Sequence, residues 1–109
     1  MAGKQGIPDA VCVKIKASVV QFNEDVVKKP QRSFSVRIRG KYVYIDRDDY
    51  GIVGPRARLT YTGDLEQWEF AIYKYSDERY DPNEWMFPGA EHLDGTIEGA
   101  LRAAMGVYP

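Results

Sequence analysis

Residues 33–45 are SFSVRIRGKYVYI, and the alternation of apolar and polar side chains in this stretch decides the fold class. Phe34, Val36 and Ile38 share one parity, with a serine or an arginine between them. Gly40 supplies a turn residue, and the alternation resumes after it. Because successive side chains of a strand point to opposite faces, the pattern predicts a β-hairpin with one apolar face.

Two further strands are predicted downstream of this hairpin. Residues 55–61 and 67–75 repeat the period of two, and a loop over residues 46–54 and a turn at Gly63-Asp64 connect the segments. Short connections between consecutive strands favour antiparallel neighbours. We therefore expect a four-stranded antiparallel meander.

Residues 9–29 fit two patterns. Apolar residues alternate from Val11 to Val19, as in a half-buried strand. One helical face is also apolar and consists of Val11, Ile15, Val19, Phe22 and Val26. The helical spacing continues where the alternation fails, and the segment is longer than an ordinary strand. Pro8 suits a helix start and Lys28-Lys29-Pro30 a helix end, so we predict a helix, with a partial strand as the alternative.

The C-terminal part carries closely spaced signals for helix starts and turns. Asp81-Pro82-Asn83-Glu84 predicts a short capped helical turn, and Pro88-Gly89 predicts a tight turn. A final helix is predicted to begin near Asp94, with an apolar ridge of Ile97, Leu101 and Met105. Beside this ridge runs a strip with almost no side chain, formed by Gly95, Gly99 and Ala103. Glycine disfavours a helix by roughly 1 kcal/mol relative to alanine, so the strip predicts close packing of another element.

The predicted architecture is α+β. It consists of an N-terminal helix, a four-stranded antiparallel meander and a C-terminal helix, with both helices on one face of the sheet. Residues 1–7 are expected to be a flexible N-terminus. Residues 8–109 are expected to form a single globular domain, which suits a chain of 109 residues.

The composition limits the classes of function. Hydrophobic residues make up 44% and charged residues 28%, which is ordinary for a globular domain. The net charge of −1 disfavours a general nucleic-acid binder, which usually carries a basic excess. Cys12 is the single cysteine, which excludes an intrachain disulfide and fits a reducing compartment. The sequence has no signal peptide and no apolar run of membrane-spanning length, so we expect a cytoplasmic protein without a membrane partner.

Two segments are candidates for a metal or catalytic site. Asp46–Gly51 resembles the first half of a calcium loop, but Tyr50 and Ala57 stand where oxygen ligands are required. A ligand-binding or catalytic loop over residues 81–94 is an alternative, because a histidine lies among carboxylates there; its residues are Glu84, Glu91, His92 and Asp94. The same residues also suit a turn and a helix cap. The sequence has no nucleophile arrangement, phosphate-binding loop or metal-ligand spacing, so no catalytic residue, metal or cofactor is expected.

In the predicted strands, many residues that alternate with the apolar ones are arginine or tyrosine. Their side chains are expected on the sheet face that points away from the helices. These residues are Arg37, Arg39, Tyr42, Tyr44, Arg56, Arg58, Tyr73 and Tyr75. Ordinary cross-strand packing produces such a face. A protein or homodimer interface also fits, because tyrosine and arginine are frequent at hot spots. Guanidinium groups and rings suit nucleic acid as well. We expect a non-enzymatic interaction module using this face, with a protein partner first and weak nucleic-acid binding as the alternative.

Overall fold

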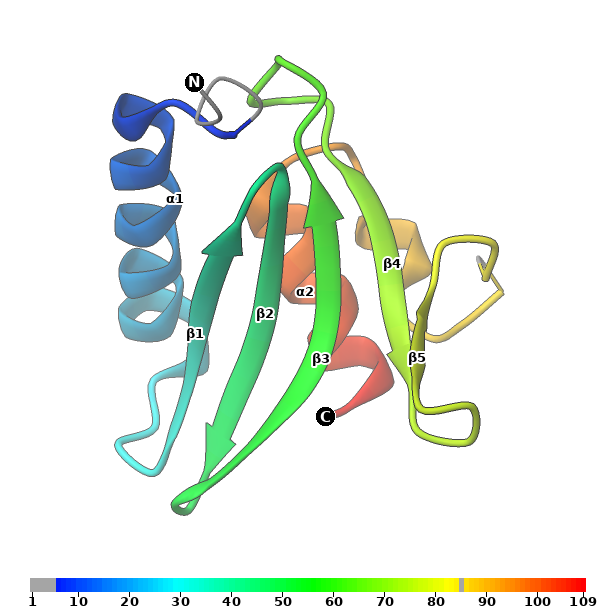
Figure 1. The fold of residues 1–109 in the computed structure, drawn as a ribbon. Helices are drawn as coiled ribbons and strands as arrows, with labels where there is room; N and C mark the ends of the chain where they lie inside the picture. Colours follow the sequence, from blue (N-terminus) through cyan, green and yellow to red (C-terminus); the bar gives the residue numbers. More distant parts are fainter. Residues whose placement is uncertain (1–5, 85) are drawn as a thin grey trace.

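A computed structural model describes residues 6–84 and 86–109. The elements in chain order are α1 (Asp9–Phe22), the π-helical turn η2 (Asn23–Val27), β1 (Arg32–Arg39), β2 (Tyr42–Asp49), β3 (Ile52–Thr60), β4 (Glu69–Lys74), β5 (Arg79–Asp81), the 3-10 turn η3 (Ala90–His92) and α2 (Ile97–Val107). Within the described residues the strands form one antiparallel sheet in the order β1-β2-β3-β4-β5 (Figure 1). The predicted α+β architecture is confirmed.

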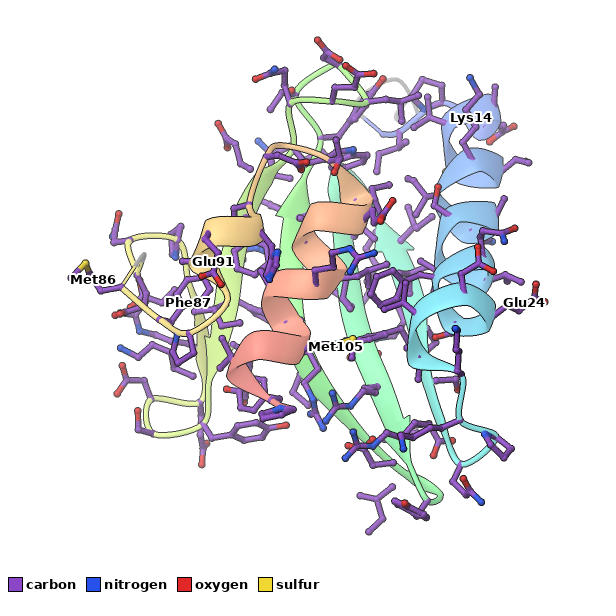
Figure 2. The ribbon with its side chains drawn as sticks, turned by 180° about the vertical axis from the view of Figure 1, so that it is seen from behind. Lys14, Glu24, Met86, Phe87, Glu91 and Met105 are labelled. Atoms are coloured by element: carbon purple, nitrogen blue, oxygen red, sulfur yellow. The ribbon has the colours of Figure 1, made fainter. Side chains whose placement is uncertain are left out.

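Both helices lie on the same side of the sheet. α1 lies beside β1 and α2 lies behind β3 in Figure 1, and the view from behind shows the two helices over the sheet (Figure 2). The largest fully buried side chains come from both helices' inner faces and from the central strands; they are Ile15, Val43, Ile45, Leu59 and Leu101. The core therefore lies between the helices and one face of the sheet. The other face carries no helix in the described part of the chain.

The predicted N-terminal helix is confirmed as α1 with η2. Its buried residues are Ile15, Val19, Phe22 and Val27. The helical segment ends at Lys28, whose φ of 56° is left-handed. Asn23 ties this end to β1, because its side chain exchanges hydrogen bonds of 3.0 and 2.8 Å with the backbone of Phe34. The expected flexible N-terminus, residues 1–7, lies mainly outside the described residues, although Ile7 is buried in the core.

The sheet contains a fifth strand, β5, in addition to the four predicted from the sequence. β5 pairs with β4, with Tyr80 opposite Tyr73. It ends at Asp81, where a helical turn was predicted. The carboxylate of Asp81 accepts a hydrogen bond from the N–H of Asn83 (2.9 Å), so it closes a turn through the neighbouring backbone and caps no helix. A three-residue strand is too short to display a period of two.

The contacts at the start of α2 explain why the residue at position 99 of the strip is glycine. Thr96 is the N-cap, and its hydroxyl accepts a hydrogen bond from the N–H of Gly99 (3.0 Å). The carboxylate of Asp94 accepts hydrogen bonds from the N–H and hydroxyl of Thr96 (3.0 and 2.6 Å). A Cβ on Gly99 would lie 2.5 Å from the carbonyl oxygen of His92. The preceding loop therefore packs directly on the backbone of α2 at Gly99.

Gly99→Ala should destabilise the protein although alanine favours a helix. The added methyl overlaps a backbone carbonyl that cannot move alone, and such overpacking costs about 1–3 kcal/mol. Urea unfolding would measure the change. Glu98→Ala is the matched control, because it removes only an exposed ion pair with Arg102, which contributes little. A Gly99→Ala protein as stable as the wild type would contradict the packing described for this strip.

Candidate functional site

The open side of the sheet carries a cluster of aromatic rings. The ring of Tyr80 meets those of Tyr44 and Tyr73 edge to face, with centroids 5.4 and 4.9 Å apart. The guanidinium of Arg58 lies over the rings of Tyr42 and Tyr80, 4.9 and 5.6 Å from their centroids. We call this surface the tyrosine face; it comprises Arg37, Arg39, Tyr42, Tyr44, Arg58, Tyr73 and Tyr80. Strands distant in sequence thus supply one continuous surface.

Strand register brings these residues together. Arg37 lies opposite Tyr44 in the β1–β2 pair, and Tyr44 lies opposite Arg58 in the β2–β3 pair. Six of the eight residues expected on this face are placed there by the same alternation. Tyr80 was missed because it belongs to β5, and the available signal was the polar run 76–78 between two tyrosine-containing segments.

A carboxylate fixes Arg37 within the tyrosine face. Asp46 is buried at 7% exposure and accepts two hydrogen bonds from the Arg37 guanidinium, at 2.7 and 3.3 Å. This hydrogen bonding raises the pKa of Arg37. The same guanidinium lies 5.0 Å from the centroid of the Tyr44 ring. Burial and the charge of Asp46 raise the pKa of Tyr80, so its phenol is neutral at physiological pH.

Arg58 has no comparable partner. Its Nε is buried and has no hydrogen-bond acceptor, and among the described residues it forms no ion pair. The rings of Tyr42 and Tyr80 hold the guanidinium in place by cation–π contact. A fixed cation with unused donors therefore lies in the middle of the tyrosine face.

Arg56 departs from the expected alternation. The β2–β3 register shifts between Ile45 and Asp46, and Arg56 is the extra residue of β3 at this bulge. Its side chain therefore lies away from the tyrosine face. It is 9% exposed, donates a hydrogen bond to Asp49 (2.9 Å) and lies 5.1 Å from the centroid of the Tyr108 ring.

Tyr75 lies at the border of the tyrosine face, where β3 and β4 separate. β4 pairs with β3 only over Ala57–Thr60, and it then diverges from β3 (Figure 1). The hydroxyl of Tyr75 donates to the carbonyl oxygen of Pro55 (3.0 Å) and accepts from Arg56 (2.8 Å). Its ring meets the ring of Tyr108 edge to face at 5.6 Å. We call this region, filled by Arg56, Tyr75 and Tyr108, the seam.

The carboxylate of Asp49, which lies beside the seam, forms ion pairs with three arginines. Oxygen atoms of Asp49 lie 3.1 Å from Arg32, 3.0 Å from Arg47 and 2.9 Å from Arg56. Arg47 is 3% exposed and also donates to the carbonyl oxygen of Tyr108. Burial lowers the pKa of Arg47. Burial of Asp49 opposes its ionisation, but the hydrogen bond from Arg47 and the charges of the three arginines outweigh it and lower the pKa of Asp49.

Asp49→Asn should destabilise the protein by about 3 kcal/mol at neutral pH. Breaking a buried ion pair typically costs this much or more, and Asp49 keeps 23% of its side chain exposed, which favours the lower end. Because the folded pKa of Asp49 lies below the unfolded value, its contribution is present above the unfolded pKa and is lost as pH falls through the folded pKa.

Urea unfolding at neutral and acidic pH would test this expectation. The wild type and Asp49→Asn should converge in acid, where the wild-type carboxyl is protonated. Asp77→Asn is the control, because its carboxylate is 46% exposed and contacts Arg79 only at 4.0 Å. An unchanged difference between wild type and Asp49→Asn at low pH would show that the charge of Asp49 is not what stabilises the cluster.

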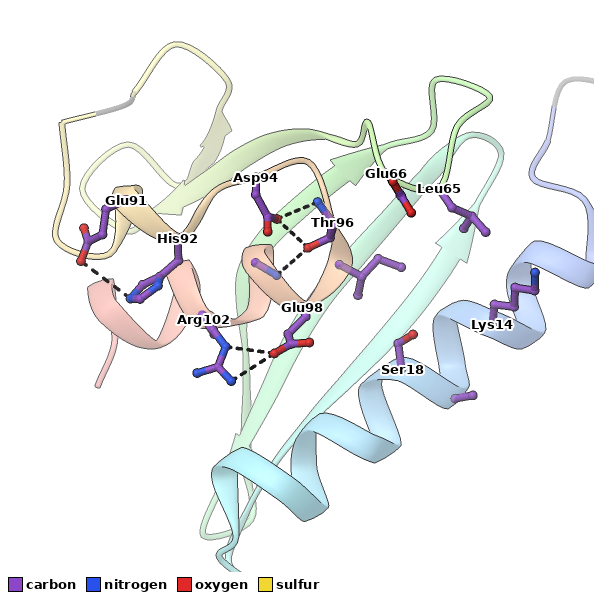
Figure 3. A pocket seen from close by; sticks show the side chains of 13 residues that line it. Lys14, Ser18, Leu65, Glu66, Glu91, His92, Asp94, Thr96, Glu98 and Arg102 are labelled. Atoms are coloured by element: carbon purple, nitrogen blue, oxygen red, sulfur yellow. Dashed lines mark hydrogen bonds and ion pairs between the residues drawn. The ribbon is translucent and has the colours of Figure 1, made fainter.

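A groove of about 830 Å³ lies between α1, α2 and the β3–β4 loop (Figure 3). It contains three of the four residues predicted for a loop site, namely Glu91, His92 and Asp94. The fourth, Glu84, lies elsewhere and accepts a hydrogen bond from Lys74 (3.3 Å).

The polar residues of this groove serve the start of α2. Hydrogen bonds from the hydroxyl and N–H of Thr96 lower the pKa of Asp94. His92 lies 3.7 Å from Glu91, and both side chains are largely exposed. Within residues 6–84 and 86–109, no three His, Cys, Asp or Glu side chains are grouped to hold a metal ion. Asp94 therefore binds Thr96, the N-cap residue of α2, and His92 lies at the surface.

Comparison with other proteins gives no relative for this chain. Neither a protein-family model, nor a curated protein, nor a solved structure matches it. No described helix is long and apolar enough to cross a membrane.

Proposed function

We propose that this chain is a non-enzymatic interaction module that binds an acidic segment of a partner protein through the tyrosine face. The observation that carries the proposal is Arg58, a half-buried arginine whose guanidinium is held between two tyrosine rings and forms no ion pair among the described residues. Its Nε is buried and closed to a partner, so an incoming carboxylate would supply the opposite charge and pair with the terminal N–H groups. Bidentate arginine–carboxylate pairs are among the strong hydrogen-bonded contacts.

Cationic side chains already lie over the tyrosine rings, which favours a protein partner over a nucleic-acid partner. The ring of Tyr42 has Arg58 and Lys41 over it, at 4.9 and 5.7 Å. The ring of Tyr44 has Arg37 over it, and the ring of Tyr80 has Arg58. Nucleic-acid bases stack on free aromatic faces. A rigid surface of packed tyrosines instead suits a protein partner, because it offers a large contact area at low entropic cost.

Charge favours a different protein over a second copy at this surface. A two-fold interface places the same patch on both subunits. Such an interface would bring the cations Arg39, Lys41 and Arg58 of both subunits together, and Asp46 is already paired with Arg37. An acidic partner segment avoids this repulsion, which motivates its choice.

Photo-crosslinking would identify what binds this surface. A photoreactive residue replaces Ser35, which is exposed on β1 with the same parity as Arg37, and the matched control replaces Val13 on α1. We expect a protease-sensitive adduct from the Ser35 position in lysate of the source cells, with none from the Val13 position. A nuclease-sensitive adduct would replace the proposal with nucleic-acid binding. Equal labelling from both positions would contradict a specific site.

Arg58→Ala should weaken binding of the cross-linked partner segment by at least about 30-fold, because truncating a central hot-spot residue costs about 2 kcal/mol or more. Arg58→Lys should lose part of the affinity, since lysine keeps the charge but not the planar fork. Arg102→Ala, an exposed arginine on α2, is the control and should bind as the wild type does. Isothermal titration with the isolated segment would measure all four proteins. Equal affinities for wild type and Arg58→Ala would reject the proposed site.

A further inference from the structure

The turn between β2 and β3 exposes apolar side chains at the end of the sheet. The exposed fractions of Tyr50, Ile52 and Val53 are 70%, 76% and 59%. The hairpin that carries them projects at the bottom of Figure 1. We call residues 50–53 the finger.

The backbone of the finger is strained at Tyr50. Its φ is 57°, and Gly51 follows with a φ of 92°. Such a two-residue turn favours Asn-Gly, and a bulky residue in the left-handed region is unfavourable. Among the described residues the hydroxyl of Tyr50 makes no hydrogen bond and its ring pairs with no other ring. The side chain of Tyr50 therefore makes no contact that explains this backbone conformation, and such conformations are frequent at functional sites.

A loop with exposed lysines lies next to the finger. The N–H of Tyr50 donates to the carbonyl oxygen of Gln31 (2.8 Å), which places the loop before β1 beside the turn. This loop carries Lys28 and Lys29, both exposed, whereas Arg32 at the start of β1 is already paired with Asp49. The finger is therefore an apolar tip beside a loop with two exposed lysines.

The groove between the helices has the complementary chemistry. Leu65 and Ala17 supply apolar lining beside the buried Ile97. Four acidic side chains line the groove, namely Glu66, Glu91, Asp94 and Glu98, against the two cations Lys14 and Arg102 (Figure 3). Glu91 is 74% exposed, whereas Glu98 is already paired with Arg102. The groove volume of about 830 Å³ lies within the usual range for ligand pockets.

We propose that the finger of one copy inserts into the groove of a second copy. Tyr50 and Ile52 would cover the apolar lining, and Lys28 and Lys29 would approach Glu66 and Glu91, since Glu98 is already paired with Arg102. The contact joins two different surfaces, so it is a head-to-tail interface that leaves one finger and one groove free. A symmetric finger-to-finger contact would instead bring the lysines of both copies together, which is unfavourable.

Sedimentation velocity over a range of concentrations tests the interface. The wild type should form species larger than a single chain as its concentration rises. Ile52→Asp, which blocks the finger, and the double variant Glu66→Lys with Glu91→Lys, which blocks the groove, should each remain monomeric. Val13→Asp on α1 and Glu24→Lys on η2 are the matched controls, because both residues are exposed and neither lines the groove, and they should associate as the wild type does. Glu24 points away from α2 in Figure 2.

Mixing the two blocked variants distinguishes head-to-tail from symmetric contact. The groove variant still has a finger and the finger variant still has a groove, so the mixture should form a one-to-one dimer and nothing larger. A wild type that stays monomeric at all concentrations would overturn the proposal. A mixture that stays monomeric while the wild type associates would overturn it as well.

Tyr50→Asn separates assembly from folding. Asparagine tolerates the left-handed backbone, so the variant should melt several degrees higher than the wild type. The loss of the aromatic side chain should at the same time weaken self-association at least tenfold. A variant that is more stable and associates as strongly as the wild type would remove Tyr50 from the interface and overturn the proposal.

Discussion

The separation of β4 from β3 is the constraint on which the rest of the structure depends. The two strands pair only over Ala57–Thr60 of β3, so the sheet needs other atoms to fill the seam. Arg56, Tyr75 and Tyr108 fill it, and Tyr108 also donates its hydroxyl hydrogen to the carbonyl oxygen of Tyr73. These contacts join the C-terminal end of α2 to β3 and to the end of β4. The position of α2, and with it one wall of the groove, follows from how the seam is closed.

The same bulge that closes the seam determines the charge of the tyrosine face. It turns Arg56 toward Asp49, where Arg32 and Arg47 also bind, so one carboxylate bridges three arginines on the helix side of the sheet. On the open side Asp46 is already paired with Arg37. Arg58 is consequently left between tyrosine rings without an acceptor. The unpaired cation that motivates the proposed function is thus a result of strand register and not of overall charge, which is close to zero.

The sequence was sufficient for the fold wherever a long periodic segment decided the structure. Phe34, Val43 and Ile45 are buried as the alternation predicted, and the helical stripe predicted to end at Val26 outweighed the shorter alternation before it. The π-helical turn η2 buries Val27 and leaves Val26 half-buried. β5 was missed because three residues carry no measurable period. The placement of Arg56 could not be predicted, since Arg56 and Arg58 have equal parity and only the local register shift distinguishes them. The groove was equally hidden, because α1 and the β3–β4 loop meet α2 only through tertiary packing.

The two proposed surfaces are compatible because they lie on different sides of the molecule. The tyrosine face is on the open side of the sheet, whereas the groove is on the helix side and the finger is at the end of the β2–β3 hairpin. Copies joined from finger to groove would therefore keep every tyrosine face available. A partner with several acidic segments would then meet several sites at high effective concentration, and its avidity would exceed the affinity of a single face. Self-assembly would in this way regulate a weak interaction through the number of linked copies, with no change in the tyrosine face itself.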